Sequence, residues 1–348
     1  MAISHEIINQ AVERYWREFD RYAKLSEFVG EACRQLLEQD VIRGSVTWRA
    51  KNPERLRAKL EKWITDPKYQ NVASVDDIFR ELKDLAGARI TTYVESEKET
   101  VIASLGKRFD GIGQSEVCPE VKDHPASHYR ATHCLVTMRP EDLVGRYENL
   151  RGVGCEIQVC SLLAHVYSEI EHDLRYKPLS GILSDQEKKL LDGLGHLVAT
   201  GDVIINQTLL AVANRQAENT DKFEDEYDFV TRMRALFPRA GKFAANAGQL
   251  YDVCGKLGLD SPDKIRQAIQ YDNNTPDNAL REAETVAGKV AADGGQTRVE
   301  TDTSDQLLIL LLKDKDRVAK LKELYPSGRG VGRAPRFLSI AKRMEEAE

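Results

Sequence analysis

Residues 153–177 read VGCEIQVCSLLAHVYSEIEHDLRYK, a strand pattern that runs directly into a helix pattern. Alternation of side chains along the strand places Glu156 and Gln158 on the same face. The helix that follows has an apolar stripe at Leu163, Ile170 and Leu174, and a polar stripe at His165, Glu169, His172 and Tyr176. Polar groups are costly to bury unless they are paired or bind something. The stretch therefore predicts a functional site beside Glu156.

Composition limits the class of protein. The chain has 348 residues, of which 41% are hydrophobic and 30% charged, enough for one large domain or two ordinary ones. The longest fully apolar run, Leu307–Leu312, is far shorter than the roughly 20 residues of a membrane helix. The first residues lack a signal-peptide pattern, so we expect a cytoplasmic protein without membrane contact. The six cysteines form no C-x-x-C pair, and most of them are expected to be buried thiols.

Hydrophobic periodicity predicts the order of the elements. Helices are expected over 6–40 and 53–64, and nearly continuously from residue 184 onward. Alternating or β-branched runs predict strands at 88–94, 129–138 and 154–160. This order predicts an α/β (α+β) fold, with a mixed β-sheet flanked by helices and followed by a helical accessory domain. We place the catalytic domain at residues 1–230 and the accessory domain at 231–348.

Cations and carboxylates in the first half suggest phosphate chemistry. The net charge is −6, but residues 43–62 and 313–343 are locally basic. In the first window, Arg49, Lys51 and Lys59 could converge on a polyphosphate, although a solvated helix face is an equally ordinary explanation. Asp84 precedes a predicted strand and could share one Mg²⁺ with Glu156.

Five short motifs occur together in one order. They are R-x-K with a later Lys (Arg49, Lys51, Lys59), D-L-x-G-x-R (Asp84, Gly87, Arg89), Y-R-x-x-H (Tyr129, Arg130, His133), E-I-Q-V (Glu156 to Val159) and E-H-x-L-x-Y-K (Glu171, His172, Leu174, Tyr176, Lys177). In this order, residues 10–215 resemble RelA/SpoT-type alarmone synthetases. The resemblance implies a nucleotidyltransferase-like fold. No hydrolase domain precedes the motifs, so the chain resembles a small, synthesis-only member.

The resemblance also implies an activity and roles for particular residues. Enzymes of this family transfer pyrophosphate from ATP to the ribose 3′-hydroxyl of GDP or GTP, which makes (p)ppGpp. The ATP phosphates would be held by Arg49, Lys51, Lys59 and Arg89. Asp84 would bind Mg²⁺, and Glu156 would be a second metal ligand or the general base. Tyr129 would stack on the acceptor base, with His133 and Gln158 nearby.

The chain departs from the family pattern mainly on the acceptor side. Arg55 stands where Ser is frequent, His128 replaces the Gly before Tyr129, and Cys160 replaces an Arg. A toxin-like enzyme that places pyrophosphate on the 3′ end of tRNA therefore remains an alternative, with the basic windows as the tRNA surface. A catalytically inactive nucleotide-sensing or partner-binding module is a third possibility. The C-terminal helices are expected to serve oligomerisation or to bind a regulatory protein.

Overall fold

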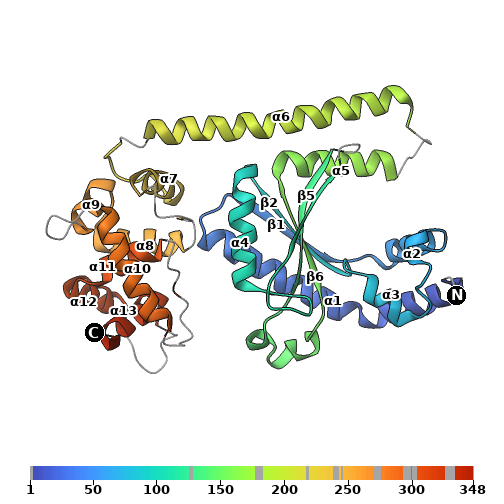
Figure 1. Cartoon of the computed structure of the whole chain (residues 1–348), viewed down its shortest axis with the longest axis horizontal. Helices are drawn as coiled ribbons and strands as arrows, with labels where there is room; N and C mark the ends of the chain where they lie inside the picture. The colour runs from blue at the N-terminus through green and yellow to red at the C-terminus, as the bar shows by residue number, and fades with distance from the viewer. Residues whose placement is uncertain are drawn as a thin grey trace. The chain divides into compact units, whose positions relative to one another are not determined.

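The chain divides into two compact units (Figure 1). The computed structural model describes residues 3–124, 128–176, 183–216, 219–237, 243, 246–269, 276–292, 299, 304–325 and 334–347. Unit 1 comprises Met1–Leu36 and Arg43–Asn206, and unit 2 comprises Leu37–Ile42 and Gln207–Glu348. The functional boundary expected after residue 230 stays a prediction.

A six-stranded sheet forms the centre of unit 1. Its strands are β1 (Gly44–Ala50), β2 (Ala86–Thr92), β3 (Asp110–Gly111), β4 (Pro119–His124), β5 (Tyr129–Thr137) and β6 (Cys155–Ser161). The order is β1-β2-β6-β5-β3, and β4 also pairs with β5. Strands β2 and β6 are parallel, whereas the other pairs are antiparallel. The predicted mixed sheet is therefore confirmed.

Helices cover this sheet (Figure 1). They include α1 (His5–Gln39), α4 (Lys98–Arg108) and α5 (Leu162–Tyr176). On one face of β6, Cys155, Ile157 and Val159 are completely buried. On the other face, Cys160 packs with Ala164 of α5. The chain thus enters α5 directly from β6, and α5 lies on the face of the sheet to which Glu156 belongs.

Two short helices connect β1 with β2. They are α2 (Pro53–Trp63) and α3 (Val75–Glu81), with a 3₁₀ turn at Pro67–Tyr69 between them. The start of α2 is fixed locally because Asn52 accepts hydrogen bonds from the backbone amides of Glu54 and Arg55. Pro53 occupies the first helical position, where a missing N–H costs nothing.

The face that α5 buries is not the apolar stripe seen in its sequence. The residues that α5 buries are Ala164, Tyr167 and Glu171, whereas Ile170 and Leu174 of the predicted apolar stripe are exposed. Ala164 packs against Ala131 and Cys160 of the sheet.

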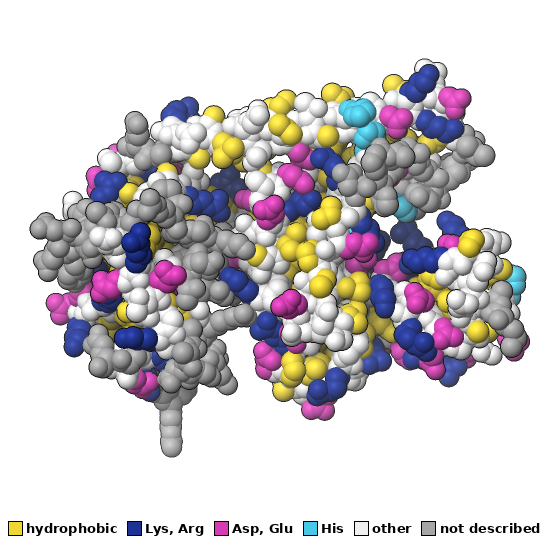
Figure 2. Space-filling view, viewed as in Figure 1, with side chains coloured by type: hydrophobic (Ala, Val, Ile, Leu, Met, Phe, Trp, Pro, Cys, Tyr) yellow, Lys and Arg dark blue, Asp and Glu magenta, His cyan; other side chains and the backbone are white. Residues whose placement is uncertain are grey.

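Helix α6 (Asp185–Gln216) has an exposed apolar surface. Leu190 is 68% exposed and Leu197 is 70% exposed, and Figure 2 shows hydrophobic side chains along this helix. By length and composition alone, Asp185–Arg215 is apolar enough to cross a membrane, with 6% of its apolar window buried. One such helix is weak evidence. The expected cytoplasmic location and lack of membrane contact stay predictions.

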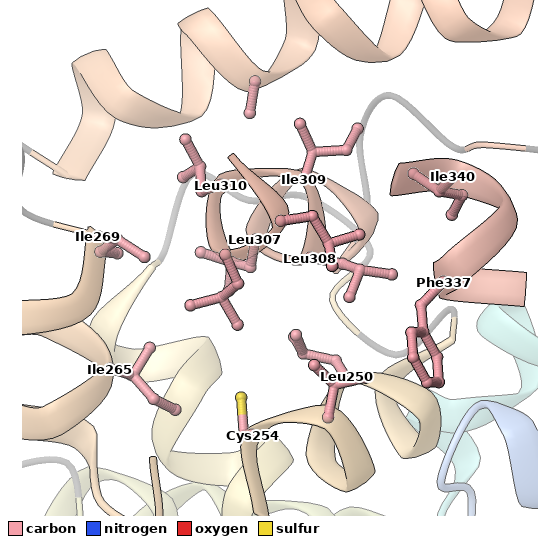
Figure 3. Close-up of a cluster of buried hydrophobic side chains, with 14 of the residues drawn as sticks. Leu250, Cys254, Ile265, Ile269, Leu307, Leu308, Ile309, Leu310, Phe337 and Ile340 are labelled. Atoms are coloured by element: carbon pink, nitrogen blue, oxygen red, sulfur yellow. The ribbon is translucent and has the colours of Figure 1, made fainter. Parts of the chain in front are cut away.

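Unit 2 is built from helices, which confirms the predicted helical C-terminal part. They are α7 (Glu226–Leu236), α8 (Ala247–Leu257), α9 (Pro262–Ile269), α10 (Pro276–Ala292), α11 (Asp305–Leu312), α12 (Lys315–Leu324) and α13 (Arg336–Ala347). Every residue of α11 is buried, as expected for a helix that is apolar all round. Figure 3 shows its side chains Leu307 and Leu308 among those of neighbouring helices. The buried Asp305 is paired with Arg336.

Candidate functional site

A pocket of about 230 Å³ lies over strands β1, β2 and β6. It is lined by Thr47, Trp48, Arg49, Lys51, Asp84, Gly87, Ala88, Arg89, Glu156 and Gln158. Strand register explains this set, because Arg49, Gly87 and Glu156 are successive neighbours across the three strands. Thr47, Arg89 and Gln158 form the adjacent row. Gly87 has no side chain, so the middle of the first row stays open.

At one end of the pocket, which we call the donor end, a carboxylate is held by two ammonium groups. Asp84 Oδ2 accepts hydrogen bonds from Lys51 Nζ at 2.6 Å and from Lys59 Nζ at 3.0 Å. Burial by itself raises the pKa of Asp84, but the two ammonium groups outweigh burial and lower that pKa below its ordinary value. The backbone of Lys51 is fixed by Tyr15, whose hydroxyl donates to the Lys51 carbonyl at 2.6 Å.

At the other end, the acceptor end, three side chains form a hydrogen-bonded chain. Glu156 Oε1 lies 2.9 Å from His133 Nδ1, and His133 Nε2 lies 2.9 Å from the Tyr129 hydroxyl. A carboxylate can only accept, so Nδ1 carries the proton and donates to Glu156. Burial raises the pKa of Tyr129 to about 12, which keeps this hydroxyl protonated. The second oxygen of Glu156 accepts from Gln158 Nε2 at 3.1 Å.

Glu156 is ionised despite its burial. Burial raises the pKa of this carboxyl, whereas the hydrogen bond and positive charge from His133 lower it. A further hydrogen bond from Gln158 acts in the same direction, and the pKa of Glu156 lies below its ordinary value. Both oxygens are therefore held in place by donors while the group keeps its negative charge.

Arg89 links the sheet to α5. Its guanidinium donates to Gln158 Oε1 at 3.1 Å and to Glu169 Oε1 at 2.5 Å. It also lies 3.0 Å from His165 Nδ1. Burial and the Arg89 charge lower the pKa of His165, so this ring is neutral and accepts the hydrogen bond. Arg49, by contrast, makes no side-chain hydrogen bond or ion pair within the described residues.

The structure brings the sequence-predicted site residues together in two ways. Six of them line the pocket directly: Arg49, Lys51, Asp84, Arg89, Glu156 and Gln158. The other three reach it through hydrogen bonds, Lys59 through Asp84, and Tyr129 and His133 through Glu156. His165 and Glu169 were noticed as a polar stripe but not linked to Arg89. Thr47 and Trp48 gave no signal beyond their place on a strand.

The carboxylates of this pocket fit a hard divalent cation. Asp84 Oδ1 is buried without a hydrogen-bond partner, which leaves one oxygen unsatisfied. Asp84 also raises the pKa of Glu156 through its charge, as expected for two carboxylates on one face. Mg²⁺ prefers oxygen ligands and uses one or two carboxylates together with water and phosphate oxygens. Among the described residues no group of three or more His, Cys, Asp or Glu could hold a metal. The pocket therefore fits a cation that is held by one or two carboxylates and completed by water and phosphate oxygens.

Cations opposite paired carboxylates, on one face of a mixed sheet, form an arrangement that suits the binding of phosphate groups. Residues 48–180 match the family model described as a region found in RelA/SpoT proteins. The chain therefore contains a RelA/SpoT-type region, and the resemblance predicted from sequence is confirmed for these residues. No curated protein matches the chain.

Several solved structures are similar. The small alarmone synthetase 1 from Bacillus subtilis is 22% identical, with a TM-score of 0.47, over 58% of this chain and 99% of that one. Its complex with the product pppGpp gives 21% identity and a TM-score of 0.44, over 57% and 98%. A GTP pyrophosphokinase family protein from Streptococcus pneumoniae is 21% identical, with a TM-score of 0.46, over 63% and 97%.

Proposed function

We propose that this chain transfers pyrophosphate from ATP to the ribose 3′-hydroxyl of GDP or GTP. One observation carries the proposal: a single pocket holds Arg49, Lys51 and Arg89 next to the carboxylates of Asp84 and Glu156. Transfer of a phosphoryl group needs cations around the phosphates and a carboxylate within reach of the attacking hydroxyl. The volume of about 230 Å³ suits the reacting phosphates better than two whole nucleotides.

The donor end would hold ATP. The guanidinium of Arg49 is unpaired among the described side chains and offers a planar fork to phosphate oxygens. Lys51 and Lys59 would exchange part of their contact with Asp84 for contact with phosphate. Asp84, whose Oδ1 has no hydrogen-bond partner, would hold Mg²⁺, which would supply charge neutralisation at the phosphates when it is bound.

The acceptor end would provide the base. The 3′-oxygen attacks the β-phosphorus of ATP, and Glu156 takes the hydroxyl proton. The bond between the β-phosphorus and the oxygen bridging to the α-phosphate breaks, and its electron pair leaves with AMP. His133 and Gln158 hold the two oxygens of Glu156 in place throughout, because each donates to one of them.

The test is incubation of the purified chain with γ-labelled ATP, Mg²⁺ and one acceptor at a time: GDP, GTP or deacylated tRNA. Label on a guanosine nucleotide supports the proposal. Label on tRNA alone would mean that tRNA, and not a guanosine nucleotide, is the acceptor. Label on none of the three acceptors overturns the proposal. The tRNA arm matters because Arg55 is exposed in the first basic window. In the second window Lys313, Lys322 and Arg336 are engaged in ion pairs.

A nearly isosteric variant tests the base. Glu156→Gln keeps the shape of the side chain but removes its charge, and we expect kcat to fall about 10²- to 10⁴-fold. The KM for ATP should stay within about twofold, because the donor end is untouched. Glu141→Gln is the matched control, since Glu141 is exposed on a 3₁₀ turn outside the pocket. Transfer by Glu156→Gln at the native rate would show that Glu156 is not the base.

A further inference from the structure

His128 has an unusual backbone conformation directly before Tyr129. Its φ is 51°, in the left-handed region that residues with a side chain rarely adopt. Glycine would occupy this region without strain, so the histidine is held there by its surroundings. Its side chain is only 16% exposed, so contacts of the ring with its neighbours can offset the cost of this backbone conformation.

The ring of His128 fits against a glycine of α6. A Cβ added to Gly195 would lie 2.3 Å from Cγ and 2.5 Å from Cδ2 of His128, far closer than atoms can approach. The ring of His196 packs edge-on at 4.5 Å between centroids, and Tyr167 of α5 lies at 6.1 Å. Asp192 Oδ1 is 3.9 Å from the His128 Nε2 atom. Helices α5 and α6 thus form a slot that only the absence of a side chain at 195 leaves open.

The residue after Tyr129 is also attached to α6. Arg130 pairs with Asp202 at 3.0 Å, and Ser161 at the end of β6 donates to the same carboxylate at 2.9 Å. Asp202 is 3% exposed, so this ion pair is shielded from water. About two helical turns separate Gly195 from Asp202, so both positions lie on the same side of α6. Tyr129 is therefore bracketed by two neighbours that are both fixed on one helix.

We propose that residues 195–202 of α6 act as a clamp that positions Tyr129 for acceptor binding, through His128 on one side and Arg130 on the other. The inference rests on the proposed function. Adjacent side chains of a strand point in opposite directions, so the Tyr129 ring faces His133 while Arg130 reaches α6. His128 and Arg130 are positioning residues, because neither lines the pocket.

Two glycines of α6 give a matched pair of variants. Gly195→Ala places a Cβ inside the His128 ring contact, whereas Gly193→Ala, in the same helix, meets nothing within 4 Å. Both changes favour the helix equally, so their difference reports the clamp. We expect Gly195→Ala to raise the KM for GDP about tenfold or more, with the KM for ATP and kcat within about twofold. Gly193→Ala should match the native chain.

Hydrogen exchange tests the clamp independently of activity. Amides of residues 128–134 should exchange faster in Gly195→Ala than in Gly193→Ala. If both alanine variants exchange at the native rate, the clamp is overturned even where transfer to GDP is intact. If exchange increases but the native chain labels no GDP, the clamp stands and the proposed function fails.

A double variant guards against a folding defect. His128→Gly removes the ring and should raise the KM for GDP on its own. In the combination His128→Gly with Gly195→Ala no clash is left, so the double variant should bind GDP no worse than His128→Gly alone. His128→Asn retains a residue that tolerates the left-handed conformation, and separates loss of the ring from loss of the backbone geometry. Additive effects of the two single changes would contradict the clamp.

Discussion

The two ends of the pocket hold their side chains by different means. At the donor end a carboxylate is bound by two flexible lysines, and Arg49 makes no side-chain hydrogen bond or ion pair among the described residues. At the acceptor end Glu156, His133 and Tyr129 form a continuous chain of hydrogen bonds on two paired strands. Flexible ion pairs can be exchanged for substrate, whereas a hydrogen-bonded chain is already in its working arrangement. The comparison indicates that the donor end contributes mainly to the affinity for substrate, whereas the acceptor end contributes mainly to the orientation of the reacting groups.

Among the changes that test this comparison, the largest effect is expected from Lys51. Lys51→Ala should raise the KM for ATP about 10- to 100-fold, since it removes a charge-assisted contact in a half-buried site. Lys59 is farther from Asp84 and more exposed, so Lys59→Ala should raise it only about threefold. Steady-state kinetics with ATP varied at saturating GDP gives both values. Equal effects of the two changes would contradict the view that Lys51 is the main contact.

A smaller effect is expected from His133→Ala, and it includes a shift of the pH dependence of kcat. In the native chain the His133 hydrogen bond keeps the pKa of Glu156 below its ordinary value. Without it burial dominates and this pKa rises. Because the base must be ionised, activity is lost as pH falls through the pKa of Glu156, so the acid limb of the kcat profile should move to higher pH.

Loss of orientation in the same variant should lower kcat about tenfold at neutral pH. The KM for ATP is the internal control and should not change, because the donor end is intact. An acid limb at the native position would show that His133 does not act on Glu156.

The smallest effect is expected from Glu169→Gln and has the opposite direction. Glu169 pairs with Arg89 but is largely exposed, so the pair contributes little, about 1 kcal/mol or less. Its removal frees Arg89 for phosphate and should lower the KM for ATP by about threefold or less. The gain should disappear at high salt, where the exposed pair is already screened. A rise in KM would mean that Glu169 orients Arg89 instead of competing with the substrate.

Much of the pocket was predictable from strand alternation. The spacing of Glu156 and Gln158 predicted that both face one side, and the structure places both in the pocket. The contact of Asp84 with Lys51 could not be derived, because it depends on the register between β1 and β2 and on the turn that precedes β2. Motif order indicated only that the two residues belong to one site. Local patterns fix which way a side chain points, but not which distant side chain it meets.

Two residues of the clamp on α6 are unusual for their positions in the sequence. Gly195 lies inside a helix, where glycine is unfavourable and therefore indicates a close contact. Asp202 is an acidic residue in an apolar stretch of the same helix, which indicates a buried partner. Neither signal names the partner, since His128 and Arg130 are far away along the chain. The face that α5 buries was missed for the same reason.

The chain passes from one unit to the other three times, because the short segment Leu37–Ile42 belongs to unit 2 while its flanks belong to unit 1. Val41 is part of the apolar core of unit 2, and Asp40 accepts a hydrogen bond from the Asn246 amide. Residues 1–230 prepared alone would lack most of the helices that shield Val41 from water. Separating residues 1–230 by a single cut would therefore expose apolar surface around Val41, just before strand β1 in the chain. A soluble fragment would need substitutions there.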